Sequence, residues 1–161
     1  MKGITYAPIG IIHTPFTEPR NTPIQPAGAR GIKGTIVIFP DYAEGLKDLE
    51  GFSHIILLFH CHLVKSYSPQ LKPFLDDHLR GVFATRAPSR PNPIGLSIVR
   101  LVKLEKNTIF IQDVDIVDGT PLLDIKPYFP ESFNLNEVKV GWLGGKLHYF
   151  SKTKDNSRFM R

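Results

Sequence analysis

The amino-acid sequence predicts a mainly β protein, a compact single-domain β-barrel with one or two short helices. The first observation is the spread of 14 prolines through 161 residues. Each proline removes a backbone donor and biases the preceding residue toward extended geometry, so few windows can hold a helix. The second is a series of short β-branched or alternating apolar runs. Because a doubly wound α/β sheet needs a helix after almost every strand, these strands are expected to close into a barrel.

The expected strands follow one another along most of the chain. Residues 3–14 predict the first strand, and residues 52–64 form a continuous apolar run, typical of a strand buried on both faces. Residues 97–104 and 108–117 nearly alternate between apolar and polar side chains, with Asn107 as the expected turn between them. Shorter β-branched or aromatic runs predict further strands at 35–39, 81–86 and 146–150.

Two segments are candidates for the short helices. Residues 41–49 begin with an aspartate suited to an N-cap and carry Ala43, Leu46 and Leu49 at helical spacing. Residues 71–79 are a second, shorter candidate that contains a proline. The remaining glycine-rich stretch, 141–145, is expected to form a hairpin bend.

The chain length corresponds to about one domain. Residues 1–150 are expected to form that domain, and residues 151–161 a basic tail with a frayed end. The hydrophobic share of 42% and the charged share of 22% are those of an ordinary globular protein. The net charge of +5 suits a polyanionic partner without requiring one.

Cysteine content and hydropathy exclude several classes of protein. Cys61 is the single cysteine, so disulfides within the chain and cysteine-rich zinc motifs are excluded. The longest apolar run, 55–59, is far shorter than the ~20 residues of a membrane span. The N-terminus shows no apolar signal segment. A cytoplasmic protein with no membrane partner is therefore expected.

A proline-rich loop between two predicted strands is the first candidate functional site. Residues 81–97 run from a strand into a segment with three prolines, two arginines and an asparagine. Prolines lower the entropy of the free loop, so Arg86 and Arg90 are expected to be held in place. A fixed guanidinium fork suits a carboxylate or a phosphate. The alternative is a rigid surface turn with solvated arginines.

A cluster of aspartates is the second candidate functional site. Asp118 and Gly119 form a strong turn signal between apolar runs, because glycine accepts the positive φ of a tight turn. The nearby carboxylates suit a cation, a general base or a positively charged ligand. Turn chemistry and solvated strand faces are the alternative. The cluster comprises Asp113, Asp115, Asp118 and Asp124.

The histidines on the central apolar strand are the third candidate functional site. With a period of two, His54, His60 and His62 share one face and Cys61 points to the other. Three imidazoles suggest zinc. However, His54 and His60 are six residues apart, roughly 20 Å along an extended strand, so no metal site is expected. The chain also has neither a phosphate loop nor a dinucleotide-binding glycine motif.

Four stretches together resemble the TsaA-like family of TrmO-type tRNA methyltransferases. The family's two most specific signatures are matched by a loop motif, Gly81-Val-Phe-Ala-Thr-Arg86 followed by Arg90-Pro-Asn-Pro-Ile-Gly-Leu-Ser97, and by a turn motif, Asp118-Gly-Thr-Pro-Leu-Leu-Asp-Ile-Lys-Pro-Tyr128. The remaining matches are Ile9-Gly-Ile-Ile-His-Thr-Pro-Phe16 and Gly51-Phe-Ser-His-Ile55. The resemblance covers about residues 5–130, and two long motifs at the correct spacing make it specific.

The resemblance implies a β-barrel that binds S-adenosyl-L-methionine (SAM) without a Rossmann domain, usually as a homodimer. It also implies methyl transfer to the exocyclic N6 of threonylcarbamoyl-adenosine, next to the tRNA anticodon. The cofactor contacts that carry over are Pro23, Ile24, Gln25, His62, Leu63, Arg86, Leu96, Asp118, Gly119, Thr120 and Pro121. Ile24, Leu63 and Phe133 depart from the family pattern.

Roles within this set follow from chemistry. Arg86 is expected near an anionic group, and Leu96 against the adenine. The acceptor nitrogen must lose a proton. Asp118 and His62 are the predicted catalytic residues, and Asp115 is a further candidate for the base.

The basic excess has a use in contacts with tRNA phosphates. Tyr67 and Phe74 are candidates for stacking on anticodon-loop bases. The phosphate contacts are expected from Lys33, Lys65, Lys72, Arg80 and the basic tail.

Two other functions stay open: a non-catalytic RNA-binding β-barrel module and a small metal-assisted enzyme that uses the histidines. Neither explains why the two signature motifs occur together.

Overall fold

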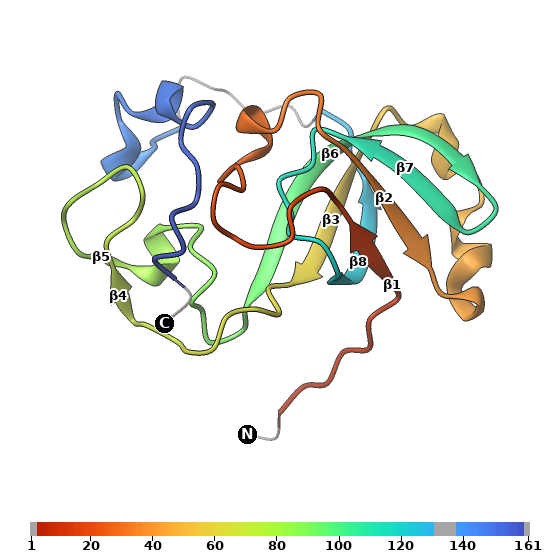
Figure 1. The fold of residues 1–161 in the computed structure, drawn as a ribbon, viewed down its shortest axis with the longest axis horizontal. Helices are drawn as coiled ribbons and strands as arrows, with labels where there is room; N and C mark the ends of the chain where they lie inside the picture. The colour runs from red at the N-terminus through yellow and green to blue at the C-terminus, as the bar shows by residue number, and fades with distance from the viewer. Residues whose placement is uncertain (1–2, 131–137, 160–161) are drawn as a thin grey trace.

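The computed structural model describes residues 3–130 and 138–159, and its main feature is a closed six-stranded barrel (Figure 1). Neighbouring strands are antiparallel throughout, and β8 closes the barrel against β1. This architecture confirms the predicted fold class. The order around the barrel is β1 (Gly10–His13), β2 (Lys33–Ile38), β7 (Thr108–Gln112), β6 (Ile94–Glu105), β3 (His54–His60) and β8 (Thr120–Pro127).

Alternate side chains of the strands fill the barrel with one apolar core. On β3, Ile55 and Leu57 are fully buried, whereas Ile56 and Leu58 lie half-buried on the outer face. This is the period of two that an extended strand imposes. The other core residues are Ile12, Ile36, Ile38, Leu46, Val99, Leu101, Ile109, Ile111, Val114, Ile116 and Leu122.

A close contact fixes the beginning of β6 against β3. Gly95 pairs with Phe59, and a Cβ on Gly95 would lie 2.2 Å from the Phe59 ring. The register of β3 against β8 shifts between Leu58 and Phe59. Such a bulge bends a strand locally, as barrel closure requires. Glycine at position 95 therefore leaves room for the Phe59 ring to lie over the beginning of β6.

Most of the predicted strands are confirmed with changed bounds. The predictions at 35–39, 52–64, 97–104 and 108–117 correspond to β2, β3, β6 and β7, and the first strand shortens to β1. Strand β7 ends at Gln112 because Asp113 has a φ of 67° and its side chain accepts a hydrogen bond from the backbone of Gly31.

Two expected strands are wrong, and one barrel strand was not expected. Residues 81–86 contain only the end of the two-residue strand β5 (Arg80–Gly81), followed by the 3-10 turn η4 (Val82–Ala84). Residues 146–150 contain the 3-10 turn η7 (Leu147–Tyr149) in place of a strand. Conversely, the sequence does not predict β8, because prolines near both ends and Asp124 interrupt its apolar pattern.

The predicted helices are present only in part. Residues 41–49 hold the 3-10 helices η2 (Pro40–Leu46) and η3 (Leu49–Gly51), and the positive φ of Asp48 separates them. Residues 71–79 are not helical; they follow β4 (Gln70–Leu71), which pairs with β5. The remaining 3-10 turns are η1 (Pro26–Gly28) and η6 (Gly141–Leu143), and no described strand flanks η6 to make a hairpin. None of the described helices is long and apolar enough to cross a membrane.

A smaller lobe stands beside the barrel, formed by β4, β5 and the C-terminal residues (Figure 1). Its own small core packs Leu71, Val82, Ala87 and Phe159 together. Phe159 is buried, so the expectation that the tail frays is wrong for the described residues up to 159. The predicted domain boundary near residue 150 stays a prediction.

Candidate functional site

The barrel topology brings the predicted site segments to one end of the barrel. Strand β3 ends there at His60, and the neighbouring strands β6 and β8 both begin there. Leu58 of β3 lies opposite Leu96 on one side and Asp124 on the other. The loop before β6 and the turn before β8 are therefore separated by one strand. We refer to this region as the site end of the barrel.

Asp115 is half-buried, and its carboxylate is held at the site end by a contact with the first residues of β6. Strand β6 extends past the end of β7, so Ser97 on the overhanging part donates a hydrogen bond to the Asp115 carboxylate. Burial raises the pKa of Asp115 to about 6, although the Ser97 hydrogen bond and the Arg86 charge both favour the ionised form. At neutral pH this carboxylate is charged and is a stronger base than an exposed aspartate.

The proline-rich loop holds its two arginines in different ways. One Nη atom of Arg90 donates to the carbonyl oxygens of Val82, Thr85 and Ala87, so Arg90 fixes the shape of the loop. Arg86 is exposed and donates to Gln25 Oε1 at 3.0 Å. Arg86 is thus the arginine that is free to meet a ligand, with Gln25 as a positioning partner.

The Asp118 turn is used to fasten β8 to the chain after β1. The backbone N–H groups of Asp118 and Gly119 donate to the carbonyls of Phe16 and Ile12. The Asp118 carboxylate accepts from the Thr14 backbone at 3.0 Å and lies 3.2 Å from His13 Nδ1. Among the described residues, no hydrogen bond or ion pair joins Asp118 to His62 or Arg86. The proposed catalytic role of Asp118 stays a prediction.

His62 lies next to the beginning of β8. Its Nδ1 is 3.4 Å from Thr120 Oγ1, which links two of the predicted cofactor-binding segments. Burial, followed by the nearby charge of His60, lowers the pKa of His62, so the imidazole is neutral at physiological pH. The neighbouring Cys61 has its pKa raised to about 11 by burial, although the Arg90 charge opposes this, and is therefore not a nucleophile.

The other predicted contacts differ in their surroundings. Leu96 is 54% exposed on the outer face of β6, as an adenine contact requires. Pro23 is buried and pairs with Lys154 in an isolated β-bridge, so it acts as a support for the site. The remaining predicted contacts, Ile24, Leu63, Gly119 and Pro121, are half-buried. Phe133 lies outside the described residues.

The three histidines of the apolar strand are not brought together. Strand β3 ends at His60, so His62 lies in the turn beyond it. His54 packs against Tyr128 at the opposite end of β3. No group of three or more metal-ligating side chains occurs in the part of the chain that the structure describes.

Sequence reasoning missed the importance of Ser97 and left Asp115 as a secondary candidate. A signal was present: Ser97 takes an inward-facing position on a strand whose other inward positions are apolar, and a buried polar group needs a partner.

The two aromatic residues predicted to contact RNA differ in their surroundings. Tyr67 is half-exposed, whereas Phe74 packs on Phe159 with ring centroids 5.0 Å apart. Phe74 is half-buried against the small core of the lobe, and its stacking on RNA stays a prediction.

Two grooves of the described surface lie outside these residues. One, of about 450 Å³, runs along the outer face of β2 and β7. The other, of about 580 Å³, lies beside η2 at the opposite end of the barrel. Neither is lined by Asp115, Arg86 or Leu96. The chemical groups, and not the depth of a hollow, mark the site.

Comparison with known proteins supports the motif assignment. A family model described as the tRNA-methyltransferase O N-terminal domain matches residues 11–133. A probable S-adenosyl-L-methionine-binding protein of Pyrococcus abyssi is 54% identical over 156 residues, which cover 97% of this chain and 85% of that protein. The tRNA (adenine(37)-N6)-methyltransferase of Escherichia coli is 36% identical over 152 residues, covering 88% of this chain and 65% of that protein.

Solved structures agree with the barrel. The crystal structure of TrmO from Pseudomonas aeruginosa superposes with a TM-score of 0.72 at 37% identity, covering 88% of this chain and 63% of that chain. This chain thus spans less than two thirds of that solved protein. The similarity in sequence and in fold extends over both signature motifs. The chain belongs to the family of the tRNA-methyltransferase O N-terminal domain, as its motifs indicated.

Proposed function

We propose that this chain is a SAM-dependent tRNA methyltransferase that modifies the exocyclic N6 of an adenosine beside the anticodon. The observation that carries the proposal is the Asp115 carboxylate, which accepts a hydrogen bond from Ser97, is influenced by the Arg86 charge and has a raised pKa, at the end of a family barrel. Relatives named tRNA (adenine(37)-N6)-methyltransferase and S-adenosyl-L-methionine-binding protein support the reaction and the cofactor. The finer assignment to threonylcarbamoyl-adenosine rests on the motif resemblance.

The residues present fit SAM by their chemistry. SAM carries a cationic sulfonium, a carboxylate and an aromatic base. Arg86 and Gln25 offer hydrogen-bond donors for a carboxylate, and a guanidinium binds carboxylates in a bidentate fashion. Leu96 offers an exposed apolar surface for the base, and the Asp115 carboxylate offers negative charge for a cation. When bound, SAM supplies an electrophilic methyl group.

The chain's own residues then orient the acceptor and remove its proton. As the new N–C bond forms, the acceptor nitrogen must lose a proton, and the Asp115 carboxylate is placed to accept it. Its raised pKa makes it a better base than an exposed aspartate while leaving it ionised at neutral pH. The hydroxyl of Ser97 fixes the orientation of the carboxylate. Asp118 and the neutral His62 remain the alternatives for this role.

We further propose a homodimer that acts in the cytoplasm, where its tRNA substrate would be found. The outer face of β3 and β6 supports a second subunit, because Ile94 and Leu96 are 41% and 54% exposed and Leu58 lies between them and β8. Large exposed apolar side chains on adjacent strands are typical of an interface.

The decisive experiment is nucleoside mass spectrometry of tRNA incubated with the protein and SAM carrying an isotopically labelled methyl group. The expected result is one labelled methyl group on a modified adenosine from the anticodon loop. RNA binding with no labelled product and no SAM affinity would instead support a non-catalytic RNA-binding module. Comparison of tRNA with and without the threonylcarbamoyl group would identify the acceptor.

A further inference from the structure

The last described residues form a strap across the smaller lobe. We define the C-terminal strap as residues 141–159, which include η6 and η7 and lie outside the barrel strands (Figure 1). Three separate anchors fix this strap to the smaller lobe and to residues 21–23. It therefore presents its exposed side chains at fixed positions.

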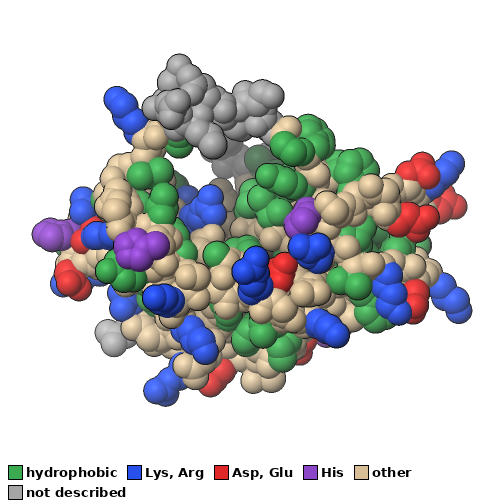
Figure 2. Space-filling view, turned by 90° about the horizontal axis from the view of Figure 1, so that it is seen from above, with side chains coloured by type: hydrophobic (Ala, Val, Ile, Leu, Met, Phe, Trp, Pro, Cys, Tyr) green, Lys and Arg blue, Asp and Glu red, His purple; other side chains and the backbone are tan. Residues whose placement is uncertain are grey.

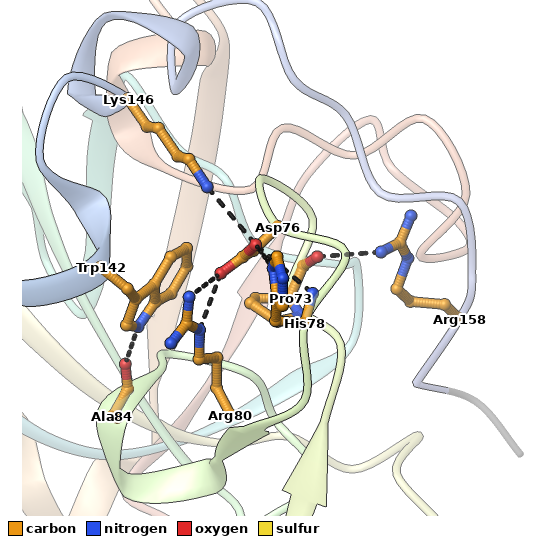
Figure 3. Close-up of polar contacts among 8 residues, drawn as sticks. All are labelled: Pro73, Asp76, His78, Arg80, Ala84, Trp142, Lys146 and Arg158. Atoms are coloured by element: carbon orange, nitrogen blue, oxygen red, sulfur yellow. Dashed lines mark hydrogen bonds and ion pairs between the residues drawn. The ribbon is translucent and has the colours of Figure 1, made fainter.

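The first anchor is a buried aspartate that gathers cations from two segments (Figure 3). The Asp76 side chain is only 4% exposed and lies 2.6 Å from Arg80 Nη2 and 3.4 Å from Lys146 Nζ of the strap. Next to it, Trp142 Nε1 donates to the carbonyl of Ala84 at 2.7 Å. The strap is thus tied to the segment that leads into the proline-rich loop.

This anchor also decides which cations are available to a partner. Arg80 and Lys146 are both committed to Asp76, and both lie near the face of Trp142 at 5.7 Å from its ring centroid. The single negative charge of Asp76 offsets one of these two positive charges, and it holds both side chains in place. Arg80 therefore has a structural role, and its expected role in phosphate contacts stays a prediction.

The second anchor is the end of the strap. Phe159 is buried against Phe74, and Arg158 donates to the carbonyl of Pro73 at 3.0 Å (Figure 3). The Arg158 guanidinium also lies over the Phe74 ring. Arg158, like Arg80, is occupied by contacts within the protein.

The third anchor places the middle of the strap beside the site. The Asn21 N–H donates to the carbonyl of Asp155, and the Asp155 N–H donates to the carbonyl of Thr22, each at 2.8 Å. The ladder continues to the bridge between Pro23 and Lys154. Two residues beyond Pro23 is Gln25, the partner of Arg86. The strap therefore lies next to the predicted cofactor loop.

Three exposed cations remain uncommitted along this ladder. Arg20, Lys152 and Lys154 are exposed, and within residues 3–130 and 138–159 no carboxylate forms an ion pair with any of them. Lys and Arg side chains are spread widely over the face seen in Figure 2. What distinguishes these three is their place on or next to the ladder that joins the strap to residues 21–23.

We propose that Lys152 and Lys154 of the strap, with Arg20 beside them, bind phosphates of the RNA whose base is methylated at the site end. The proposal rests on the proposed function, because the phosphates belong to the same RNA. Neutralising phosphates releases counterions, which supplies affinity that depends on salt and little on sequence. Anchoring the strap beforehand reduces the entropy lost on binding.

The test compares two variants with the same charge change. The strap variant carries Lys152→Gln and Lys154→Gln; the control carries Lys47→Gln and Lys106→Asn, two exposed lysines at the opposite end of the barrel. The dissociation constant for tRNA is measured by fluorescence anisotropy between low and high KCl. The strap variant is expected to bind about tenfold more weakly near physiological salt, with a salt slope smaller by about 1.4 to 1.8. The control is expected to match the wild type.

Calorimetric titration with SAM distinguishes this proposal from the proposed function. The strap variant is expected to retain the SAM affinity of the wild type. Equal tRNA affinity and equal salt slope in the strap and control variants would overturn the strap proposal, even if the wild type methylates tRNA. Conversely, a wild-type protein that binds tRNA through the strap but forms no methylated product would overturn the proposed reaction alone.

Discussion

At the scale of single residues, the raised pKa of Asp115 predicts how the rate of methylation depends on pH. A general base must be ionised, and burial raises the pKa of Asp115 to about 6. The rate of methylation is therefore expected to rise with pH up to about 6 and to level off above it. Asp115→Asn removes the base, and the rate is expected to fall by about 10²- to 10⁴-fold. Single-turnover assays across this pH range check both expectations.

Ser97→Ala provides the matched control for this prediction. The Ser97 hydrogen bond lowers the pKa of Asp115, so its loss moves the rising limb of the rate profile to higher pH. A purely structural role for Ser97 would lower the rate at every pH without moving the limb. Wild-type turnover in Asp115→Asn would transfer the role of base to Asp118 or His62.

The same carboxylate also affects stability. The pKa of Asp115 rises from 3.8 to about 6 on folding, so the unfolded chain holds fewer protons and stability falls as pH rises between these values. Two pKa units correspond to about 3 kcal/mol, of which a weakened Ser97 hydrogen bond offsets about 1. Asp115→Asn is expected to raise the free energy of unfolding at pH 8 by about 2 kcal/mol, and by much less at pH 3.5. Urea denaturation at both values measures this, and a variant less stable than wild type at pH 8 would contradict it.

Arg86 is expected to bind the cofactor and not to maintain the fold. It is exposed and makes one hydrogen bond, to Gln25, so Arg86→Ala leaves no buried group without a partner. A charged hydrogen bond contributes roughly 1.5–3 kcal/mol, so the SAM affinity is expected to fall about 10- to 100-fold. Calorimetry measures the affinity and thermal melting measures the fold. Arg30→Ala, which removes another exposed arginine, serves as the control; unchanged SAM affinity in Arg86→Ala would remove Arg86 from the site.

At the scale of elements, local patterns predicted five of the six barrel strands, all but β8, whereas contacts between distant segments decided the rest. Alternation of apolar residues located β6 and β7, and proline placement limited the helices. Residues 146–150 have the composition of a strand, yet the contact of Lys146 with Asp76, 70 positions earlier in the chain, holds them in a 3-10 turn. Such contacts leave no periodic signal in the sequence.

The candidate site, too, could be predicted from the sequence only in part. The two signature motifs located Arg86 and the Asp118 turn, because both depend on residue types in a row. The pairing of Ser97 with Asp115 could not be predicted, because it requires that β6 extend beyond the end of β7. The position of Asp113 in the left-handed region ends β7 and produces this overhang.

The Asp76 anchor makes a prediction about how the strap is held. Hydrogen bonds from His78 and Arg80 and the Arg80 charge hold the pKa of Asp76 well below its usual range, although burial opposes this. Its contribution to stability is therefore present above the unfolded pKa near 3.8 and lost as pH falls toward the lower folded value. Asp76→Asn is expected to lower the melting temperature at pH 7, and this difference from the wild type is expected to shrink as pH falls from 3.8 toward the folded pKa.

Hydrogen exchange locates the effect of this substitution. Amides near Arg80 and Trp142 are expected to exchange about tenfold faster in Asp76→Asn, because local opening of the lobe becomes easier. Asp77→Asn changes the neighbouring exposed aspartate and serves as the control. Equal exchange in the two variants would mean that Asp76 does not hold the strap.

At the scale of the whole molecule, the exposed apolar face of β3 and β6 predicts that two copies of the chain associate. Ile94 and Leu96 are 41% and 54% exposed beside the site, where a monomer would leave them in water. Association would cover them and would also enclose the open cofactor surface around Leu96.

The substitution Ile94→Glu tests association more cleanly than a change at Leu96, because Ile94 is not among the predicted cofactor contacts. A buried unpaired carboxylate strongly opposes association. Sedimentation equilibrium is expected to give a mass of twice 18.1 kDa for the wild type and a single chain for the variant. Circular dichroism should show the same β content in both, and the monomeric variant is expected to bind SAM more weakly. A wild-type protein that sediments as a monomer at micromolar concentration would show that one barrel forms its cofactor site alone.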